Sequence, residues 1–264
     1  MEGIKIVIVD DEPEIGFFMK LRLLSEAPHF DIIIKGGGRE CLDYLKENGA
    51  DCILSDYQMP GMDGMELLGE LKSIGCGIPF IFITGQGNEQ LAREAFKNGA
   101  YDYFTKEIGF AHFARIINSI EQAVSHRQAI DERKKLEDEL MLVKEAVESL
   151  PIGITISDLS GRIIYTNPAE ASMHGYSVEE LVGMDARVFA PPGFWKPLSF
   201  DQIYSSGAWK RTAANVRKDG VLFPVVLTSI AVKDAAGTPI GIITACENNA
   251  SGASENSCPQ PAES

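Results

Sequence analysis

The sequence has few cysteines, no long apolar run and little positive charge. The cysteines include no C-x-x-C pair and no metal-binding spacing, so reduced thiols that mostly fill the core are expected at Cys41, Cys52, Cys76, Cys246 and Cys258. No apolar run reaches about 18 residues, which predicts that no helix spans a membrane. The first residues enter a strand pattern directly, without the features of a secretion signal. Together these absences predict a cytoplasmic protein.

Positive charge is scarce, because the chain has 24 Lys and Arg residues but 38 Asp and Glu residues. Its formal net charge is −14. Such a chain repels phosphates, so direct DNA binding and binding to anionic membranes are not expected. The sequence also shows no basic recognition helix, ATP-binding glycine-rich segment or cyclase module. His29, His112 and His126 lack the E-[LI]-x-x-P context of a kinase phosphoacceptor. No enzymatic output is therefore expected, and the 264 residues suit two domains of ordinary size.

The first half of the chain alternates between β-prone and helical stretches. The strands are predicted near 4–9, 30–35, 51–55, 79–83 and 101–104, and the helices near 13–27, 38–48, 63–74 and 88–98. This alternation predicts an α/β domain with a five-stranded parallel sheet that is covered on both faces. The segment GGGRE at 36–40 invites comparison with a cyclase motif, but its place between strand and helix favours a turn and a helix start.

Polar residues stand at the ends of four of these strands. Asp10 and Asp11 follow the first strand, Asp56 follows the third, Thr84 ends the fourth and Lys106 follows the fifth. The carboxyl ends of parallel strands converge at the switch point of strand order, where ligands bind. Each motif alone also suits a solvated turn, but their joint occurrence predicts one site built from four strands.

The residue types at this site suit phosphoryl transfer. An aspartate can act as a nucleophile toward phosphorus, and crowded carboxylates need a cation among them. Mg²⁺ fits, with Asp11 and Asp56 as direct ligands, Asp10 acting through water and the main-chain carbonyl of Gln58 as a further ligand. Lys106 would supply a point charge to a phosphoryl oxygen. The Thr84 hydroxyl would donate a hydrogen bond, and Gly85 beside it leaves room for the phosphate.

Residues 1–122 resemble a response-regulator receiver domain, through the motifs IVDDEPE, SDYQMPGMDG, FITG and YFTK. The resemblance implies that Asp56 is the phosphoacceptor, Thr84 the switch hydroxyl and Tyr103 the aromatic residue that changes rotamer with it. It also implies a doubly wound sheet with strand order 2-1-3-4-5 and a partner histidine kinase. One departure is Glu107, which follows Lys106 where the family usually has a proline in a cis bond. A cis bond before a non-proline residue costs about 2.5–4 kcal/mol, so the efficiency of switching stays open.

Two apolar seams with heptad-like spacing follow the receiver motifs. We expect the first to pack on the receiver sheet, and it comprises Phe113, Ile117, Ile120 and Val124. The second seam follows a charged run, and its heptad register is shifted by two positions relative to the first. It comprises Leu136, Leu140, Val143, Val147 and Leu150. The pattern predicts an extended last receiver helix, or a closely following linker helix, over 123–148. The second seam predicts a homodimer, with packing back onto the next domain as the alternative.

Residues 149–248 predict a smaller α+β domain with an antiparallel sheet. Two β-prone runs flank the turn DLSG, short helices follow, and three further strands are joined by the turns KDG and DAAG. This part resembles a PAS domain, through IIYTNPAE, GYSVEELVG, RKDGVLFPV and GTPIGIITA. PAS domains sense small molecules, light or redox state, or simply dimerise. The tail over 249–264 is expected to be disordered because it has little to bury.

The resemblance allows some PAS cofactors to be judged from the residues that they would need. Ala186 stands where the flavin-binding subclass carries its reactive cysteine, which excludes a cysteinyl-flavin photocycle. A haem would need an axial ligand such as histidine, and His174 is interpreted instead as a cap or packing residue. We expect Trp209, Phe223 and Met173 to be core residues rather than a cofactor site. The sequence thus identifies no cofactor for the PAS domain.

Two functional hypotheses follow from the sequence. The first is a two-component phosphorelay protein, whose receiver takes phosphate on Asp56 with Mg²⁺ and whose PAS domain relays the signal by dimerisation or docking. In this hypothesis the chain is not an enzyme beyond Mg²⁺-dependent self-phosphorylation from phosphodonors and loss of the same phosphate. The alternative is a PAS sensor of a ligand or cofactor, with the receiver as a regulated docking module.

Overall fold

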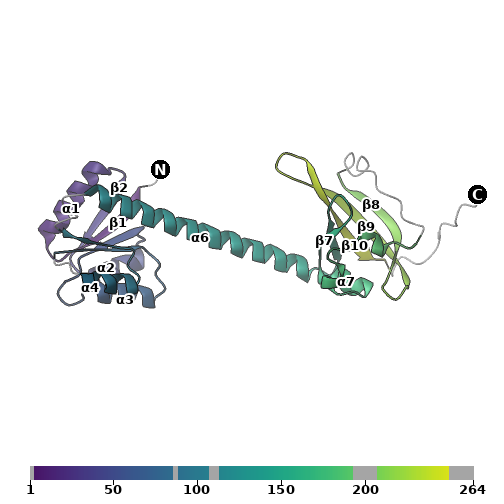
Figure 1. Ribbon diagram of the computed structural model, residues 1–264, viewed down its shortest axis with the longest axis horizontal. Coiled ribbons are helices and arrows are strands. Elements are labelled where there is room, and N and C mark those ends of the chain that lie inside the picture. The colour runs from purple at the N-terminus through teal and green to yellow at the C-terminus, as the bar shows by residue number, and fades with distance from the viewer. Residues whose placement is uncertain (1–2, 86–88, 107–112, 193–206, 250–264) are drawn as a thin grey trace, which may run out of the picture. The chain divides into compact units, whose positions relative to one another are not determined.

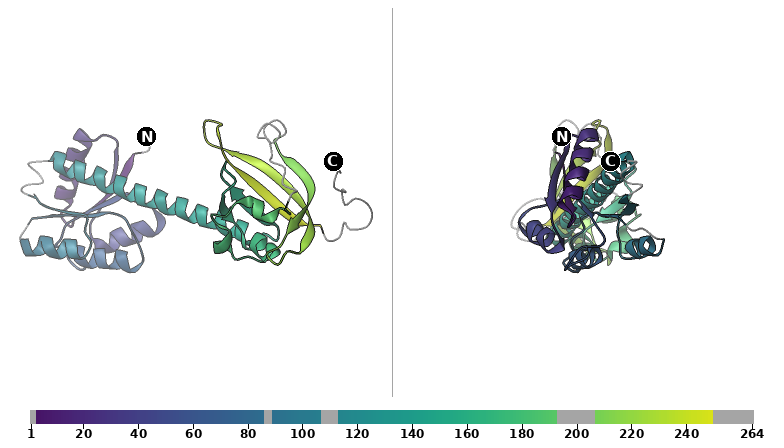
Figure 2. Two further views of the ribbon diagram at one scale, coloured as in Figure 1. Left: turned by 45° about the vertical axis from the view of Figure 1, so that its right-hand side comes forward. Right: turned by 90° about the vertical axis from the view of Figure 1, so that its left-hand side faces the viewer.

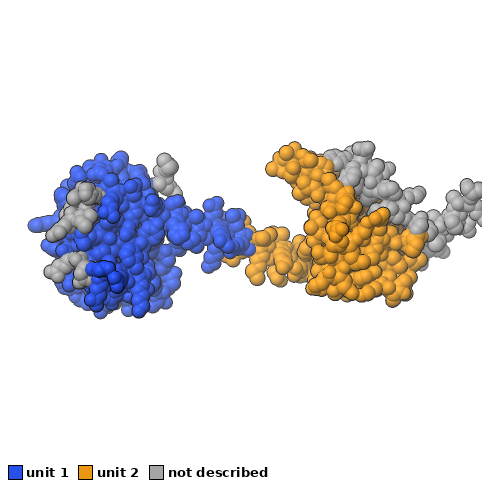
Figure 3. Space-filling model, viewed as in Figure 1, with its two compact units in different colours: residues 1–137 blue, residues 138–264 orange. Residues whose placement is uncertain are grey.

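The computed structural model describes residues 3–85, 89–106, 113–192 and 207–249. The chain forms two compact units, residues 1–137 and 138–264, which Figure 3 shows in different colours. Among the described residues, no helix has the length and apolar character needed to cross a membrane. Glu107 and almost all of the predicted disordered tail lie outside the described residues.

The first unit is built on a parallel five-stranded sheet with the order β2-β1-β3-β4-β5 (Figure 1). Every pair of neighbouring strands is parallel, which confirms the predicted doubly wound α/β fold. Its elements in chain order are β1 (Ile4–Val9), α1 (Pro13–Glu26), β2 (Phe30–Lys35), α2 (Gly38–Glu47), β3 (Cys52–Ser55), α3 (Gly64–Ser73), β4 (Phe80–Thr84), α4 (Glu89–Lys97) and β5 (Asp102–Thr105). Helix α2 begins at the predicted turn, so the segment GGGRE is a helix start.

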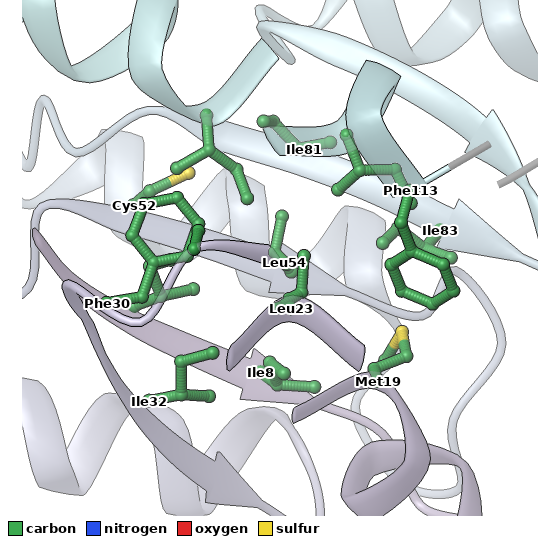
Figure 4. Close-up of a cluster of buried hydrophobic side chains, with 14 of the residues drawn as sticks. Ile8, Met19, Leu23, Phe30, Ile32, Cys52, Leu54, Ile81, Ile83 and Phe113 are labelled. Carbon is green, nitrogen blue, oxygen red and sulfur yellow. The ribbon is translucent and has the colours of Figure 1, made fainter. Parts of the chain in front are cut away.

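Each face of this sheet has its own core, because alternate residues of a strand point to opposite faces. Ile6 and Ile8 of β1 pack with α1 and with the start of the helix α6 (Phe113–Ser149), and Figure 4 shows part of this cluster. Val7 and Val9 of the same strand belong to a second cluster that includes residues of α2, α3 and α4. Burial on both faces explains why the strand sequences are apolar throughout rather than alternating.

Helix α6 runs without interruption through the charged segment between the two apolar seams. The first seam packs on the receiver sheet as predicted, since Phe113, Ile120 and Val124 are buried and Ile117 lies against them. The charged segment is supported by ion pairs four residues apart, such as Arg133 with Glu137. Of the two forms that the sequence left open, the structure has the extended helix.

The second unit is an antiparallel five-stranded sheet with the order β7-β6-β10-β9-β8, and Figure 2 shows its twist. Both the predicted hairpin and the three later strands are present. Its elements are β6 (Gly153–Ser157), β7 (Ile163–Thr166), α7 (Pro168–His174), α8 (Val178–Leu181), the 3₁₀ helix η1 (Ala186–Phe189), β8 (Trp209–Val216), β9 (Leu222–Lys233) and β10 (Pro239–Asn248).

A buried asparagine fixes the position of α7 against this sheet. The Asn167 Oδ1 atom accepts hydrogen bonds from the backbone N–H groups of Ile154, at 2.8 Å, and of Glu170, at 3.0 Å. Its amide nitrogen donates to the carbonyl oxygen of Ile152 at 2.9 Å. Asn167 is fully buried and caps α7, and Pro168 follows at a position that suits the first turn of a helix. The cap therefore ties the helix to strand β6.

The expected core residues of the second unit are only partly confirmed. Phe223 is buried, and Met173 packs against its cluster. Trp209 is only half-buried, and the guanidinium of Arg211 lies over its ring at 4.0 Å. The prediction for Trp209 as a core residue was therefore wrong, because it begins an edge strand that has a neighbour on one side only.

Candidate functional site

The predicted site residues follow the carboxyl ends of four neighbouring strands. Strands β1 and β3 pair in register up to Val9 and Ser55, so Asp10 and Asp56 are each one residue beyond the last pair. Their backbones are fixed as well, because the Asp56 N–H donates to the Val9 carbonyl at 2.8 Å and the Asp10 N–H to the Lys35 carbonyl at 3.1 Å. The geometry of the sheet thus brings the two carboxylates together.

Three carboxylates form a cluster at this edge. One oxygen each of Asp10, Asp11 and Asp56 lies within 4.8 Å of the others. Asp10 and Asp56 are only 1% and 7% exposed, whereas Asp11 is half-buried. Burial raises the pKa of Asp10, although the hydrogen bond from the backbone N–H of Glu12 and the nearby ammonium of Lys106 oppose that shift. A buried acidic cluster of this kind is costly unless cations compensate its charge.

Lys106 supplies part of that compensation. Its Nζ donates a hydrogen bond to Asp56 Oδ2 at 2.7 Å and lies 3.1 Å from Asp10 Oδ2. Burial lowers the pKa of Lys106, but the two aspartates outweigh burial and raise it overall. The carboxylate of Glu12 is also within 3.8 Å of the Nζ atom. The ammonium group is therefore held in its charged form directly beside Asp56.

The remaining charge fits a small hard cation. Asp10 Oδ2 is buried and makes no hydrogen bond of good geometry among the described residues, despite its ion pair with Lys106. Together, Asp10, Asp11 and Asp56 offer oxygen donors of the kind that Mg²⁺ prefers. Bound there, Mg²⁺ would neutralise charge on the carboxylates and on a phosphate.

The backbone around Asp56 is fitted closely to it. The N–H of Gln58 donates to Asp56 Oδ1 at 3.3 Å, which places the predicted Gln58 backbone beside the carboxylate. A Cβ atom added to Gly64 would lie 2.3 Å from the Asp56 carbonyl oxygen and 2.7 Å from the Phe82 ring. Sequence reasoning gave no role to Gly64 or Glu12. The signal for Gly64 was its place directly after Asp63, which begins α3 with a capping box.

The predicted switch residues also belong to this side of the sheet. Thr84 is buried at the end of β4. Tyr103 is half-buried on β5, where burial raises its pKa first, followed by the proximity of Tyr57 and the Asp56 carboxylate. A Cβ atom added to Gly85 would meet only Lys106 Cδ, at 3.9 Å, so space remains there. The structure thus places Thr84 at the carboxyl end of β4 and Tyr103 close enough to Asp56 for its charge to act on the phenol.

Comparisons with known proteins identify both domains of the chain. The model of the response regulator receiver domain matches residues 6–118, and that of the PAS domain matches residues 151–249. The transcriptional regulatory protein MalR of Bacillus subtilis is 31% identical over 183 residues, which cover 67% of this chain and 77% of MalR. The chain therefore belongs to the response regulators, with a receiver domain followed by a PAS domain.

Other relatives match the receiver part. ZraR of Escherichia coli, also a transcriptional regulatory protein, is 31% identical over 130 residues, so the match covers 49% of this chain but only 28% of ZraR. The solved structure FixJ-N is 31% identical with a TM-score of 0.43, and covers 48% of this chain and 97% of its own. A PAS domain from Colwellia psychrerythraea is 20% identical with a TM-score of 0.36, and covers 41% of this chain and 95% of its own.

Proposed function

We propose that this chain accepts a phosphoryl group on Asp56 from a partner histidine kinase, with Mg²⁺, and that the PAS domain relays the signal. The observation that carries the proposal is the contact of Lys106 Nζ with Asp56 Oδ2 inside a cluster with Asp10 and Asp11. Three carboxylates and one buried ammonium are the components that phosphoryl transfer to an aspartate requires, because positioning and charge neutralisation dominate this reaction.

The residues have separate roles in the proposed transfer. An oxygen of Asp56 forms a bond to phosphorus while the bond between phosphorus and the donor breaks, and the donor leaves with that electron pair. Lys106 then contacts a phosphoryl oxygen, since its ammonium already lies 2.7 Å from Asp56. Asp10 and Asp11 would hold Mg²⁺ beside the incoming phosphate. Small phosphodonors such as acetyl phosphate would serve by the same chemistry.

The remaining parts of the proposal concern organisation. We assign the receiver to 1–122, a helical linker to 123–148 and the PAS domain to 149–248, and we expect the protein to act in the cytoplasm. Thr84 would bind the phosphoryl group, and Tyr103 would change its rotamer in response and so alter the surface of the receiver. The relatives are named as transcriptional regulators, but a net charge of −14 does not favour direct DNA contact by these residues.

We further propose that two copies associate through the second seam on α6. Leu136, Leu140 and Val143 are 59%, 71% and 61% exposed, which is unusual for aliphatic side chains on one stripe of a helix. The seam has the heptad-like spacing that suits packing against a second copy of the same helix. Among the described residues, these three side chains are exposed rather than buried against the PAS domain.

Mass spectrometry tests the central proposal. With Mg²⁺ and acetyl phosphate, the protein should gain one phosphate that is stable in acid and labile in base, and Asp56→Asn should gain none. Asp31→Asn is the matched control, because Asp31 is exposed on β2 and outside the cluster, and it should behave as wild type. A phosphate on Asp56→Asn, or no phosphate on the folded wild type, would refute the assignment.

A further inference from the structure

The PAS domain contains a buried cluster that sequence reasoning did not detect. Glu170 and His174 lie four residues apart on α7, and Cys246 lies on β10. Their exposed fractions are 2%, 0% and 1%, and one donor atom of each lies within 4.8 Å of the others. A carboxyl group, an imidazole and a thiol thus meet inside the domain, and none of them takes part in the proposed phosphorelay chemistry.

One carboxyl oxygen of this cluster makes no hydrogen bond within the described part of the chain. Glu170 Oε2 is buried and makes no hydrogen bond among the described residues, while Oε1 lies 3.5 Å from His174 Nδ1. The carboxyl group also fills a space that the backbone leaves open for it, because a Cβ atom added to Gly153 would lie 1.7 Å from Oε2. A buried carboxyl oxygen without a partner is costly, so a ligand that occupies it would stabilise the domain.

We propose that Glu170, His174 and Cys246 form a binding site for a borderline divalent transition metal, of which Zn²⁺ is the representative. Zn²⁺ binds thiolate, imidazole and carboxylate donors, and three protein ligands leave one position for a further ligand. Magnesium and calcium do not suit a thiolate, because they prefer oxygen donors. Geometry supports the choice. Bonds of zinc length place tetrahedral donors about 3.4–3.7 Å apart, and Oε1 and Nδ1 are 3.5 Å apart.

Asn215 is placed to orient the histidine. Its amide group lies 2.9 Å from His174 Nε2 and 3.8 Å from Cys246 Sγ, and its side chain is buried. Without metal, Nδ1 contacts the Glu170 carbonyl at 3.0 Å. Metal at Nδ1 would replace this contact and leave the ring proton on Nε2, where the Asn215 amide oxygen would accept it once the amide group has turned over. The Cys246 thiol loses its proton to solvent on binding, as does the Glu170 carboxyl group when protonated.

Metal titration of the full chain tests this site. Excess Mg²⁺ is added first to fill the receiver cluster, and Zn²⁺ is then titrated against a chromophoric chelator. We expect one zinc per chain, with binding weakened more than tenfold in Cys246→Ser and in His174→Gln. Asn215→Ala should weaken binding about 10–100-fold, as loss of a partner to a metal ligand does. Cobalt is the spectroscopic probe, because a thiolate ligand adds a charge-transfer band that Cys246→Ser should lose.

Two controls keep the experiment decisive. Cys41→Ser removes a buried thiol from the receiver and should leave zinc binding unchanged. Tryptophan fluorescence checks the fold of each PAS variant, since both tryptophans of the sequence belong to the second unit. The proposal is overturned if the folded wild type takes up no zinc, if cobalt shows no thiolate band, or if Cys41→Ser weakens binding as much as Cys246→Ser. Phosphorylation of Asp56 is independent of all these outcomes.

Discussion

At the residue scale, the receiver site is a balance between three carboxylates and one ammonium group. Lys106 contacts Asp56 and Asp10, but Asp11 has no comparable cation in the described contacts of the cluster. One positive charge cannot compensate three negative charges, so the folded state without Mg²⁺ contains uncompensated repulsion. This imbalance predicts that divalent cations stabilise the receiver.

The first prediction is that Mg²⁺ stabilises the wild type and that Asp11→Ala loses most of this effect. A ligand that binds only the folded state stabilises it by about 2.7 kcal/mol at a hundredfold excess over its Kd. Thermal unfolding with and without Mg²⁺ measures the difference, with Asp31→Asn as a control that keeps the full response. An equal rise of Tm in the wild type and in Asp11→Ala would contradict the assigned site.

The stability of the PAS domain depends on pH through two buried groups of its cluster, Glu170 and His174. Burial raises the pKa of Glu170 from 4.5 to about 8, against weaker opposition from Cys246 and Thr155. Burial also lowers the pKa of His174 from 6.5 to about 4. Between pH 6.5 and 8 the unfolded chain has already lost the Glu170 proton while the folded domain keeps it, so stability falls as pH rises. Between pH 4.5 and 6.5 the histidine acts in the opposite direction, because the unfolded chain takes up a proton that the folded domain refuses.

The second prediction follows for the metal-free protein. With chelator present, the free energy of unfolding of the PAS domain should fall between pH 6.5 and 8, by up to about 1.4 kcal/mol per pH unit. Glu170→Gln should flatten this dependence, since an amide does not titrate. Urea unfolding followed by tryptophan fluorescence measures it. A wild type and a Glu170→Gln variant with parallel pH profiles would show that Glu170 ionises normally.

At the element scale, the start of α3 is what holds Asp56 in place. The helix begins at Gly64, whose N–H donates to the Tyr57 carbonyl at 2.9 Å, and Asp63 and Glu66 close a capping box around it. The loop between Asp56 and the helix is therefore anchored at both ends. The absence of a side chain at Gly64 allows this close approach.

The third prediction compares two glycines of that helix. Gly64→Ala should destabilise the receiver by about 1–3 kcal/mol and slow phosphorylation, because the new Cβ would displace the Asp56 backbone. Gly69→Ala is the matched control. Gly69 is exposed with nothing within 4 Å of an added Cβ, so alanine should stabilise the helix by about 0.5–1 kcal/mol. Denaturant unfolding and the rate of modification by acetyl phosphate measure both. Equal effects of the two substitutions would disprove the close packing at Gly64.

At the scale of the whole molecule, α6 belongs to both units, and three residues of the second seam, Leu136, Leu140 and Val143, are exposed on it. The fourth prediction is that the wild type is a dimer and that Leu140→Glu with Val143→Glu yields a folded monomer that is still phosphorylated on Asp56. The control pair Asp138→Lys and Glu145→Lys lies on the opposite side of the helix by its spacing of about 100° per residue, and should remain dimeric. Light scattering decides the mass, and circular dichroism checks the fold. A monomeric wild type would end the dimer proposal.

The sequence by itself determined the fold class and the receiver site. Strands that are buried on both faces must be apolar throughout, so the parallel sheet was readable from continuous runs such as Ile4–Val9. Strand ends converge at one edge of such a sheet, so Asp10, Asp56 and Lys106 could be placed together without coordinates. Local patterns carry this information because each residue sits next to the strand that positions it.

Only the tertiary structure decided the features that depend on packing between distant segments. The closeness of Gly64 to Asp56 depends on where α3 docks. The continuity of α6 depends on whether the charged segment stays helical between the apolar segments on its two sides. Glu170 and His174 meet Cys246 across more than seventy residues, and no spacing rule in the sequence links them, because the register of β10 against β6 and the cap at Asn167 decide which side chains face one another. Contacts of this kind come from the docking of a helix on a sheet, which the order of residues alone does not specify.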